Sequence, residues 1–379
     1  MRPPARDPLD DPAGSPPSSP PSSPPSSPPP HTSPSSPPPH TLPSPPTRVP
    51  PPTQLAPPEP PSPALPSPGP CSSPGPRPPL ALAVDIGGTK IAVGLVAADG
   101  TLLERRRTAT PAGPSILGAV LDLARPLRER AAACGIATAG TVDPRGRIAS
   151  STDLLTGWAG TDVRGAAERA LRLPVTVLND CHAAGVAEAR IGAARGARTA
   201  LVVAVGTGIG GAVCVEGRVR TGRTGTAGSL GHLPAPAAAR LRCSCGALDH
   251  VEAYASGPAI ERAYLRETGR ALPLAEIGRL GSPVIADAAA LLGRVLAGAA
   301  NLIDPDAVVI AGGVSMLGAV LLEPLEAAYR AEALPGPAAV PLSRAALGED
   351  AGLVGAGLEA LTRLEAQSRR EAQSCPAGS

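Results

Sequence analysis

Residues 80–96 read LALAVDIGGTKIAVGLV, two apolar runs joined by a turn that contains two glycines. Residues 80–86 and 91–96 each have the length and composition of a β-strand, so this stretch predicts a β-hairpin. A third strand is expected at 102–108, after another turn at 98–100. Three antiparallel strands before the first helix are unlike the strand–helix–strand opening of a dinucleotide-binding fold.

The rest of the chain after residue 80 alternates apolar runs with helical patterns, which is typical of an α/β protein. Further strands are expected at residues 135–139, 175–178, 200–205, 212–215 and 307–311. Helices are expected at 115–133, 163–171, 181–191, 258–268, 284–302, 317–331 and 351–365. This order of elements predicts two α/β lobes with a cleft between them.

The first 79 residues have a different composition. Of the 51 prolines, 35 lie in residues 1–80, and much of this region repeats short Ser/Pro sequences. Such a segment lacks the apolar side chains that offset the entropy of ordering a backbone. We therefore expect a disordered, partly polyproline II tail, followed by a folded part of about 300 residues, which is enough for one or two lobes.

Charge, hydropathy and cysteine content exclude several classes of function. The formal net charge is +2 and the arginines are spread along the sequence, so no nucleic-acid partner is expected. We find no apolar run of membrane length and no apolar core of a signal peptide near the N-terminus, so no membrane partner is expected. Seven cysteines in a chain of 379 residues do not predict a disulfide framework, and a cytoplasmic protein is expected.

The first glycine turn has the composition of a phosphate-binding loop. Glycines let a backbone approach a ligand closely, and a threonine adds a hydroxyl donor. An aspartate at the strand end can hold a water on Mg²⁺. The alternative is an ordinary hairpin turn. The predicted ATP-binding residues here are Asp85, Gly87, Gly88, Thr89 and Lys90, the last being the only lysine of the chain.

A second glycine turn, GTGIGG at residues 206–211, again joins two apolar runs. Two such hairpins are more specific than one, because together they would surround the β- and γ-phosphates of ATP with backbone N–H groups. The residues predicted to bind ATP in this turn are Gly206, Thr207, Gly208, Gly210 and Gly211.

Asn179 and Asp180 follow an apolar strand and precede a helix. Phosphoryl transfer to a hydroxyl needs a positioned carboxylate that accepts the proton, and the end of a strand facing a cleft is a suitable place for one. Asp180 is therefore the candidate catalytic base. The alternative is that Asp180 only caps the helix.

Four of the twelve Cys and His residues fall within 19 positions. Two thiols and two imidazoles form a ligand set suited to tetrahedral Zn²⁺. With no open position for a substrate, the site would be structural. The alternative is a pair of ordinary buried thiols with two unrelated histidines. The candidate ligands are His232, Cys243, Cys245 and His250.

These motifs occur in the order and spacing of the ROK family of repressors, open reading frames and kinases, and the resemblance covers nearly all of residues 80–365. It implies an actin-like, ribonuclease H-like, two-lobed ATPase fold that uses Mg·ATP to phosphorylate a sugar. It further implies that Asp180 is the general base toward a 6-hydroxyl and that Gly312 and Gly313 lie near the adenosine. The sugar-binding residues that it implies are Gly140, Thr141, Thr152, Asn179, Asp180, His232 and Glu252.

The resemblance also implies an assembly and a division of the chain. ROK enzymes are commonly dimers or tetramers, so a homodimer or homotetramer is expected. The tail would span 1–79, the N-terminal lobe 80–180 with the last helix packing back, and the C-terminal lobe 181–350.

Two positions depart from the family pattern. His250 stands where the family usually has a third cysteine, and imidazole is an acceptable replacement. Ser229 stands where the family's kinases usually have a sugar-binding glutamate, which removes a charge-assisted hydrogen bond worth about 2 kcal/mol. Substrate identity is therefore less defined than reaction class.

The segment from Thr138 to Trp158 resembles N-acetylmannosamine kinases more than glucokinases, which often have an Asn-Leu pair where Asp153 and Leu154 stand. N-acetylmannosamine is thus slightly favoured over glucose. Trp158, the only tryptophan, has the simpler alternative of packing beneath a loop. A sugar sensor without a DNA-binding domain, or a scaffold that presents its Pro-rich tail to other modules, are the remaining alternatives.

Overall fold

The computed structural model defines residues 78–151, 155–237 and 239–374, and all statements below concern these residues. They belong to one compact unit that begins at Ser72. The predicted tail falls almost entirely outside the described residues.

The first sheet is built around the hairpin of residues 81–96. Its five strands have the order β3-β2-β1-β4-β7. Short turns join β1, β2 and β3, which therefore pair antiparallel, whereas β4 and β7 follow helical connections and run parallel to β1. The strands are β1 (Ala81–Ile86), β2 (Lys90–Val96), β3 (Leu102–Ala109), β4 (Ala133–Thr138) and β7 (Val175–Asn179).

The second sheet repeats this topology. Its order is β10-β9-β8-β11-β12, again an antiparallel meander of three strands extended by two parallel ones. The strands are β8 (Thr199–Val205), β9 (Ile209–Val215), β10 (Arg218–Val219), β11 (Ala307–Ala311) and β12 (Leu342–Arg344). Each glycine turn therefore occupies the same place in its own sheet, between the first and second strands.

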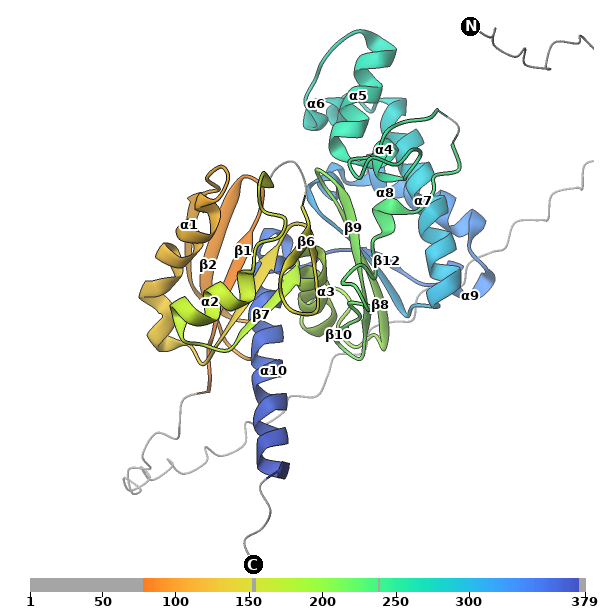
Figure 1. The fold of residues 1–379 in the computed structure, drawn as a ribbon. Helices are drawn as coiled ribbons and strands as arrows, with labels where there is room; N and C mark the ends of the chain where they lie inside the picture. The colour runs from red at the N-terminus through yellow and green to blue at the C-terminus, as the bar shows by residue number, and fades with distance from the viewer. Residues whose placement is uncertain (1–77, 152–154, 238, 375–379) are drawn as a thin grey trace, which may run out of the picture. The chain divides into compact units, whose positions relative to one another are not determined.

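Helices cover both sheets and form the cores (Figure 1). In the first sheet, α1 (Ser115–Ala124) and α2 (Val163–Leu171) bury their apolar faces in one cluster with β1, β2 and β4. In the second, α7 (Pro283–Ile303) packs on α8 (Ala319–Glu332), and both share a core with β8 and β11.

Two helices connect the sheets. Helix α3 (Asp180–Arg190) leaves the end of β7 and packs on β8 and β9 of the second sheet. Helix α10 (Ala351–Ser374) follows β12 and packs on β1, β2, β4 and β7 of the first sheet. The two helices also pack closely on each other, because Gly355 leaves no side chain between α10 and the carbonyl oxygen of Ala183.

The remaining elements are short. They are η1 (Arg125–Arg130), β5 (Thr141–Val142), β6 (Ile148–Ser150), η3 (Leu230–His232), α4 (Glu252–Ala255), α5 (Gly257–Thr268), α6 (Leu274–Arg279), η4 (Gly313–Leu317), α9 (Pro335–Ala338) and η5 (Gly348–Asp350).

Most predicted strands and helices are present with ends shifted by a few residues. The helix predicted at 115–133 is wrong in its second half, where η1 has Pro126 in its first turn and β4 then begins. A proline cannot donate the backbone hydrogen bond that would continue the α-helix. The last helix runs nine residues past its predicted end at 365. Its final turns are polar, so they carry no apolar periodicity.

Helix α7 bears on the prediction that no apolar run reaches membrane length. It has 21 residues with a mean hydropathy of 1.5 in its most apolar window, but Asp287 and Arg294 interrupt its apolar sequence. Among the described residues it is the single helix with that length and composition. More than half of that window is buried inside the protein, where α7 forms the core with α8.

The contact between α3 and α10 gives a test of the fold. A Cβ atom added at Gly355 would lie 1.8 Å from the carbonyl oxygen of Ala183. We expect Gly355→Ala to lower the free energy of unfolding by about 2 kcal/mol, because the helices must separate. In Gly298→Ala on α7, the new methyl group meets nothing within 4 Å, so stability should rise by up to about 1 kcal/mol. Chemical denaturation of both variants measures the difference, and equal stabilities would contradict this packing.

Candidate active site

Three parallel strands of the first sheet end side by side. The register aligns Ile86 of β1 with Thr138 of β4, and Thr138 with Asn179 of β7. Asp85 lies one residue before the end of β1. Trp158 is buried beneath this edge, and its indole N–H donates to the Thr138 hydroxyl at 3.0 Å. The prediction that Trp158 packs beneath a loop is consistent with this burial, and its partner lies at the strand ends.

Asn179 directly precedes helix α3, and its side-chain amide makes hydrogen bonds to the start of the helix and to Gly140. Its Oδ1 accepts hydrogen bonds from the N–H groups of Cys181 and His182, which makes Asn179 the N-cap. Its Nδ2 donates to the Gly140 carbonyl at 3.0 Å and to Asp180 Oδ1 at 2.9 Å. The amide thus joins two predicted sugar-binding positions, Gly140 and Asp180.

Asp180 is not the cap of this helix. Its Oδ1 accepts from Asn179 Nδ2 and from the Cys181 N–H at 2.8 Å. The Cys181 side chain makes a further hydrogen bond to this carboxylate. The alternative that Asp180 serves only as a helix cap is therefore not needed, since Asn179 fills that role.

The carboxyl groups of Asp85 and Asp180 lie in a shared, enclosed environment. Burial, together with the negative charge of Asp180, raises the pKa of Asp85 to about 7. Burial also raises the pKa of Asp180, opposed by the hydrogen bond from Cys181. Two carboxyl groups that resist simultaneous ionisation favour a cation nearby, and an aspartate with a raised pKa is a suitable general base.

The first glycine turn is held by its own backbone and by Thr110. The Gly87 N–H donates to the Lys90 carbonyl at 3.0 Å, and the Thr110 hydroxyl donates to the Gly87 carbonyl at 2.7 Å. The N–H groups of Gly88 and Thr89 have no acceptor among the described residues. These two amides are therefore free to donate to an anion.

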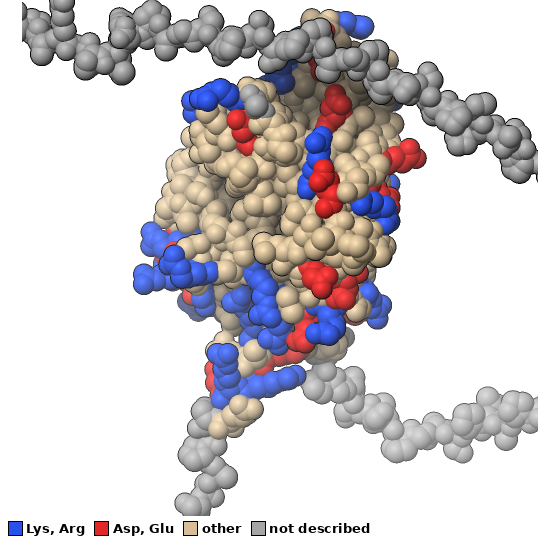
Figure 2. Space-filling view, turned by 90° about the vertical axis from the view of Figure 1, so that its right-hand side faces the viewer, with Lys and Arg blue, Asp and Glu red and all other residues tan. Residues whose placement is uncertain are grey.

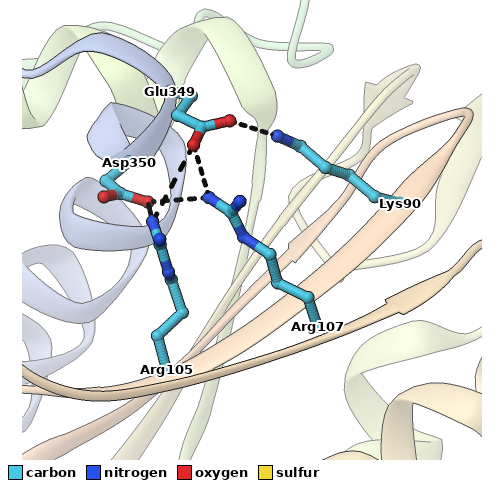
Figure 3. A network of polar contacts seen from close by, with 5 residues as sticks. All are labelled: Lys90, Arg105, Arg107, Glu349 and Asp350. Carbon is cyan, nitrogen blue, oxygen red and sulfur yellow. Dashed lines mark hydrogen bonds and ion pairs between the residues drawn. The ribbon is translucent and has the colours of Figure 1, made fainter.

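Lys90 belongs to a network of charges at the start of α10 (Figure 3). Its Nζ lies 2.5 Å from Glu349 Oε2, and Arg107 Nη2 lies 2.8 Å from Glu349 Oε1. Arg105 binds Asp350 at 2.5 Å. Hydrogen bonds from Lys90 and Arg107 lower the pKa of Glu349 to about 2. In this structure the ammonium group of Lys90 thus links β2 to η5, just before α10, and its binding to ATP stays a prediction.

The second glycine turn is shorter than the predicted turn at residues 206–211. The Gly206 N–H donates to the Gly208 carbonyl at 2.8 Å, and β9 begins at Ile209, so Gly210 and Gly211 lie in the strand. Gly312, with a φ of 86°, packs on Val205 beside this turn, where a Cβ atom would lie 2.3 Å from the Val205 carbonyl oxygen. Gly312 and Gly313 follow β11, which pairs with β8, so both predicted nucleotide segments lie at neighbouring strand ends.

Cys181, which the sequence analysis did not select, links the two halves of the site. A Cβ atom placed on Gly210 would lie 2.5 Å from the Cys181 sulfur, so β9 and the first turn of α3 are in close contact. Burial and the neighbouring Asp180 raise the pKa of the Cys181 thiol far above its usual value. The thiol is therefore uncharged and acts here as a small packing group.

The four predicted metal ligands converge. One ligand atom from each of His232, Cys243, Cys245 and His250 lies within 4.8 Å of every other. Cys243 Sγ is 3.6 Å from His232 Nδ1, and Cys245 Sγ is 3.2 Å from His250 Nδ1. Ligand atoms around a tetrahedral Zn²⁺ are separated by about 3.3–3.8 Å, so these two pairs are close to that spacing, and two thiols with two imidazoles are a donor set that suits the ion.

Glu252 connects this cluster to the second glycine turn. Its Oε2 accepts from the Ile209 N–H at 2.9 Å, and its Oε1 accepts from the Cys243 thiol at 3.4 Å and from the Ser244 hydroxyl. Within the described part of the chain, no hydrogen bond joins His232 or Glu252 to Asn179 or Asp180.

Of the remaining predicted sugar-binding residues, the structure describes Thr141 but not Thr152. Thr141 starts β5 and follows Gly140 directly, so it lies beside the Asn179 amide. Thr152 lies outside the described residues, as do Asp153 and Leu154. Ser229 uses its hydroxyl locally, donating to the Thr226 carbonyl at 2.7 Å, and does not replace the acceptor that a glutamate provides.

The repeated sheet order, with one glycine turn in each sheet and an aspartate beside the first, defines an α/β protein built from two similar halves. Residues 81–362 match the ROK family, and the chain belongs to this family.

Among curated relatives, the glucokinase of Streptomyces coelicolor is 32% identical over 309 residues, covering 73% of this chain and 96% of the relative. The N-acetylmannosamine kinase of Escherichia coli O6:K15:H31 is 34% identical over 287 residues, which cover 73% of this chain and 97% of the relative.

Solved structures agree with this assignment. A ROK hexokinase from Thermus thermophilus is similar with a TM-score of 0.69 and 36% identity, covering 76% of this chain and 99% of the other. A ROK family glucokinase from Streptomyces griseus in complex with glucose and AMPPNP is similar with a TM-score of 0.64 and 32% identity. The match covers 75% of this chain and 99% of the other. The described fold is therefore that of the ROK sugar kinases.

The raised pKa of Asp85 predicts a pH-dependent stability. The protonated form is favoured in the folded state, so the stabilisation is present at low pH and is lost as the pH rises through about 7. In the absence of Mg²⁺ and nucleotide, we compare the Tm of Asp85→Asn with that of the wild type. When the pH rises from 5.5 to 8.5, we expect this difference to change by a few degrees in favour of the variant. Thermal unfolding at both pH values measures this. The exposed Asp122→Asn is the control, and a pH-independent difference for Asp85→Asn would refute the assignment.

Proposed function

We propose that this protein is an ATP-dependent sugar kinase that phosphorylates the 6-hydroxyl of a hexose or N-acetylhexosamine. The observation that carries the proposal is the position of Asp180, whose carboxylate is held by Asn179 and Cys181 just after β7, at the edge where three parallel strands of the first sheet end side by side. Burial raises its pKa, which suits a group that must take up a proton.

The proposed reaction uses three parts of the site. Asp180 accepts the proton of the 6-hydroxyl as that oxygen forms a bond to the γ-phosphorus, and the bond from the γ-phosphorus to the ADP oxygen breaks. The free N–H groups of Gly88 and Thr89, with the turn at Gly206–Gly208, would bind the phosphates. Mg²⁺ would neutralise phosphate charge, and Asp85 is the residue placed to hold it or one of its waters.

For the sugar, we propose Asn179, Asp180, Gly140 and Thr141 on one side and His232 and Glu252 on the other. N-acetylmannosamine is slightly favoured from the sequence of residues 138–158, with glucose as the alternative. The kinases named among the relatives act on these two types of sugar.

One observation favours a second candidate, a sugar sensor. The Ser229 hydroxyl is engaged with the Thr226 carbonyl, so the site lacks the carboxylate that the family's kinases usually present there. A sensor would bind the sugar without turnover. The retained Asp180 and both glycine turns support the kinase.

We also propose a structural Zn²⁺ held by the cluster of two cysteines and two histidines. The ion would fix the loop that bears Glu252, whose carboxylate contacts both Cys243 and the Ile209 N–H. A cytoplasmic location, where these thiols stay reduced, and a homodimer or homotetramer complete the proposal.

The kinase proposal is tested by ADP release from Mg·ATP over a panel of glucose, mannose, N-acetylglucosamine and N-acetylmannosamine. We expect turnover on at least one sugar, and we expect Asp180→Asn to reduce kcat by about 10²–10⁴-fold because the base is lost. Asp122→Asn, an exposed substitution of the same type, should keep full activity. A folded wild-type protein that binds a sugar without turnover would instead identify the sensor.

The zinc proposal is tested by metal analysis. Purified protein should contain one zinc per chain, and Cys245→Ser should contain far less and unfold at a lower temperature, because one of four ligands is weakened. Cys71→Ser, which changes a cysteine that is not one of the four candidate ligands, is the matched control. Metal-free wild-type protein that takes up no zinc on titration would overturn the assignment.

A further inference from the structure

A basic cavity of about 260 Å³ lies between β10 and the C-terminal half of α10. Four arginines line it, with a single carboxylate among the lining residues. On the face drawn in Figure 2, Lys and Arg side chains are likewise concentrated in the lower half. The lining residues are Arg218, Val219, Arg220, Glu359, Thr362, Arg363, Ala366 and Arg370.

The fold brings these arginines together from distant parts of the sequence. Arg218 and Arg220 lie in and just after β10, on the edge of the second sheet. Arg363 and Arg370 are seven residues apart on α10, a spacing that places them on one face of the helix, two turns from each other. The cavity thus lies between the edge strand of the second sheet and a helix that packs on the first sheet.

The charges in this cavity are not balanced by the protein. No ion pair involves Arg218, Arg220 or Arg370 within the described residues. The one carboxylate, Glu359, is shared by Arg363 at 3.0 Å and Arg190 at 2.9 Å. Arginines held near each other without counter-charges repel one another, and an anion in the cavity would remove this repulsion.

Arg190 connects the cavity to both linking helices. From α3, its guanidinium donates to the Leu358 carbonyl at 3.0 Å, to the Thr362 hydroxyl at 2.8 Å and to the Gly217 carbonyl at 2.9 Å. It therefore joins α3, α10 and the turn before β10. Asp180 lies at the opposite end of α3, about 15 Å away by helix rise.

We infer that this cavity is a binding site for a phosphate group, separate from the catalytic residues. Arginine forks match the geometry of phosphate oxygens, and four of them in a concave site suit one or two phosphates better than a single carboxylate. An anion held by arginines from β10 and α10 would stabilise the contact between the two sheets, next to the helices that bear Asp180 and Glu349. The ligand class is a phosphorylated small molecule, either inorganic phosphate and its short polymers or a sugar phosphate.

The site is tested by calorimetric titration of the full-length protein, with its kinase site saturated by AMPPNP, Mg²⁺ and the preferred sugar. Tripolyphosphate, inorganic phosphate and glucose 6-phosphate are the probes, and their relative affinities distinguish the two sources of phosphate. We expect at least one probe to bind with one site per chain. The double variant R218A/R370A should raise its Kd at least tenfold, because two charge-assisted contacts are lost.

R369A is the matched control. It removes the same charge one residue from Arg370, from a side chain that is 80% exposed and does not line the cavity. Its Kd should stay within twofold of the wild type. An equal loss in R369A would show non-specific attraction and overturn the site, as would unchanged binding in R218A/R370A or no binding of any probe to the wild type.

The measurement does not depend on catalysis. Binding is read without turnover, and if no sugar is phosphorylated, AMPPNP with Mg²⁺ alone occupies the nucleotide site. Thermal unfolding verifies that R218A/R370A is folded, and the single variant R370A, with an expected intermediate Kd, provides a second reading if the double variant is not.

Discussion

The close packing of α3 on α10 is the constraint on which the rest of the site depends. Gly355 permits this contact, since any side chain there would meet the backbone of Ala183. Because Asp180 starts α3 and Glu349 lies just before α10, the packing of the two helices also fixes these charged groups. Gly352, in the first turn of α10, lies against the Asp85 carboxylate, where a Cβ atom would be 3.2 Å from its Oδ2.

The electrostatics around this contact differ at its two ends. Near Asp85 and Asp180, burial raises both pKa values and the negative charge of Asp180 further raises that of Asp85, so these two carboxyl groups resist ionising together without a cation. Near Arg190, Glu359 pairs with Arg190 and Arg363, while the exposed Arg218, Arg220 and Arg370 have no ion pair within the described residues. Charge of one sign gathered at a site favours a ligand of the other sign. A cation is therefore expected at the first end and an anion at the second.

Much of this fold could be predicted from sequence, because strand length and glycine turns are local signals. The hairpins at 81–96 and 199–215, the long α7 and the strand at Ala307–Ala311 all follow from apolar runs bounded by turns. The edge strands β10 and β12 could not be predicted, since two or three residues give no periodicity. Their pairing depends on the neighbouring strand, which is a tertiary contact.

The candidate site likewise has residues that the sequence predicts and contacts that it does not. Asp85, Asn179 and the four Cys and His residues could be selected because their chemistry and spacing are visible in the sequence. The sequence could not tell which of Asn179 and Asp180 caps α3, because both residue types are good caps. The partner of Lys90 was also hidden, since Glu349 is 259 positions away. Such pairs form only after both sheets are in place.

The second glycine turn shows how these separate parts could act together. Glu252 holds the Ile209 N–H with one oxygen and Cys243 with the other, so the position of the turn depends on the loop that carries the metal ligands. Gly208 lies directly beside the Glu252 carboxylate, where a Cβ atom would be 2.6 Å from Oε2, so the turn and the loop are in close contact. A rigid loop therefore fixes the turn from the side of the second sheet, while Cys181 contacts Gly210 from the side of α3. In the proposed kinase, amides of a turn held from both sides would need little reorganisation when charge develops, and this is the condition under which such groups stabilise a transition state most.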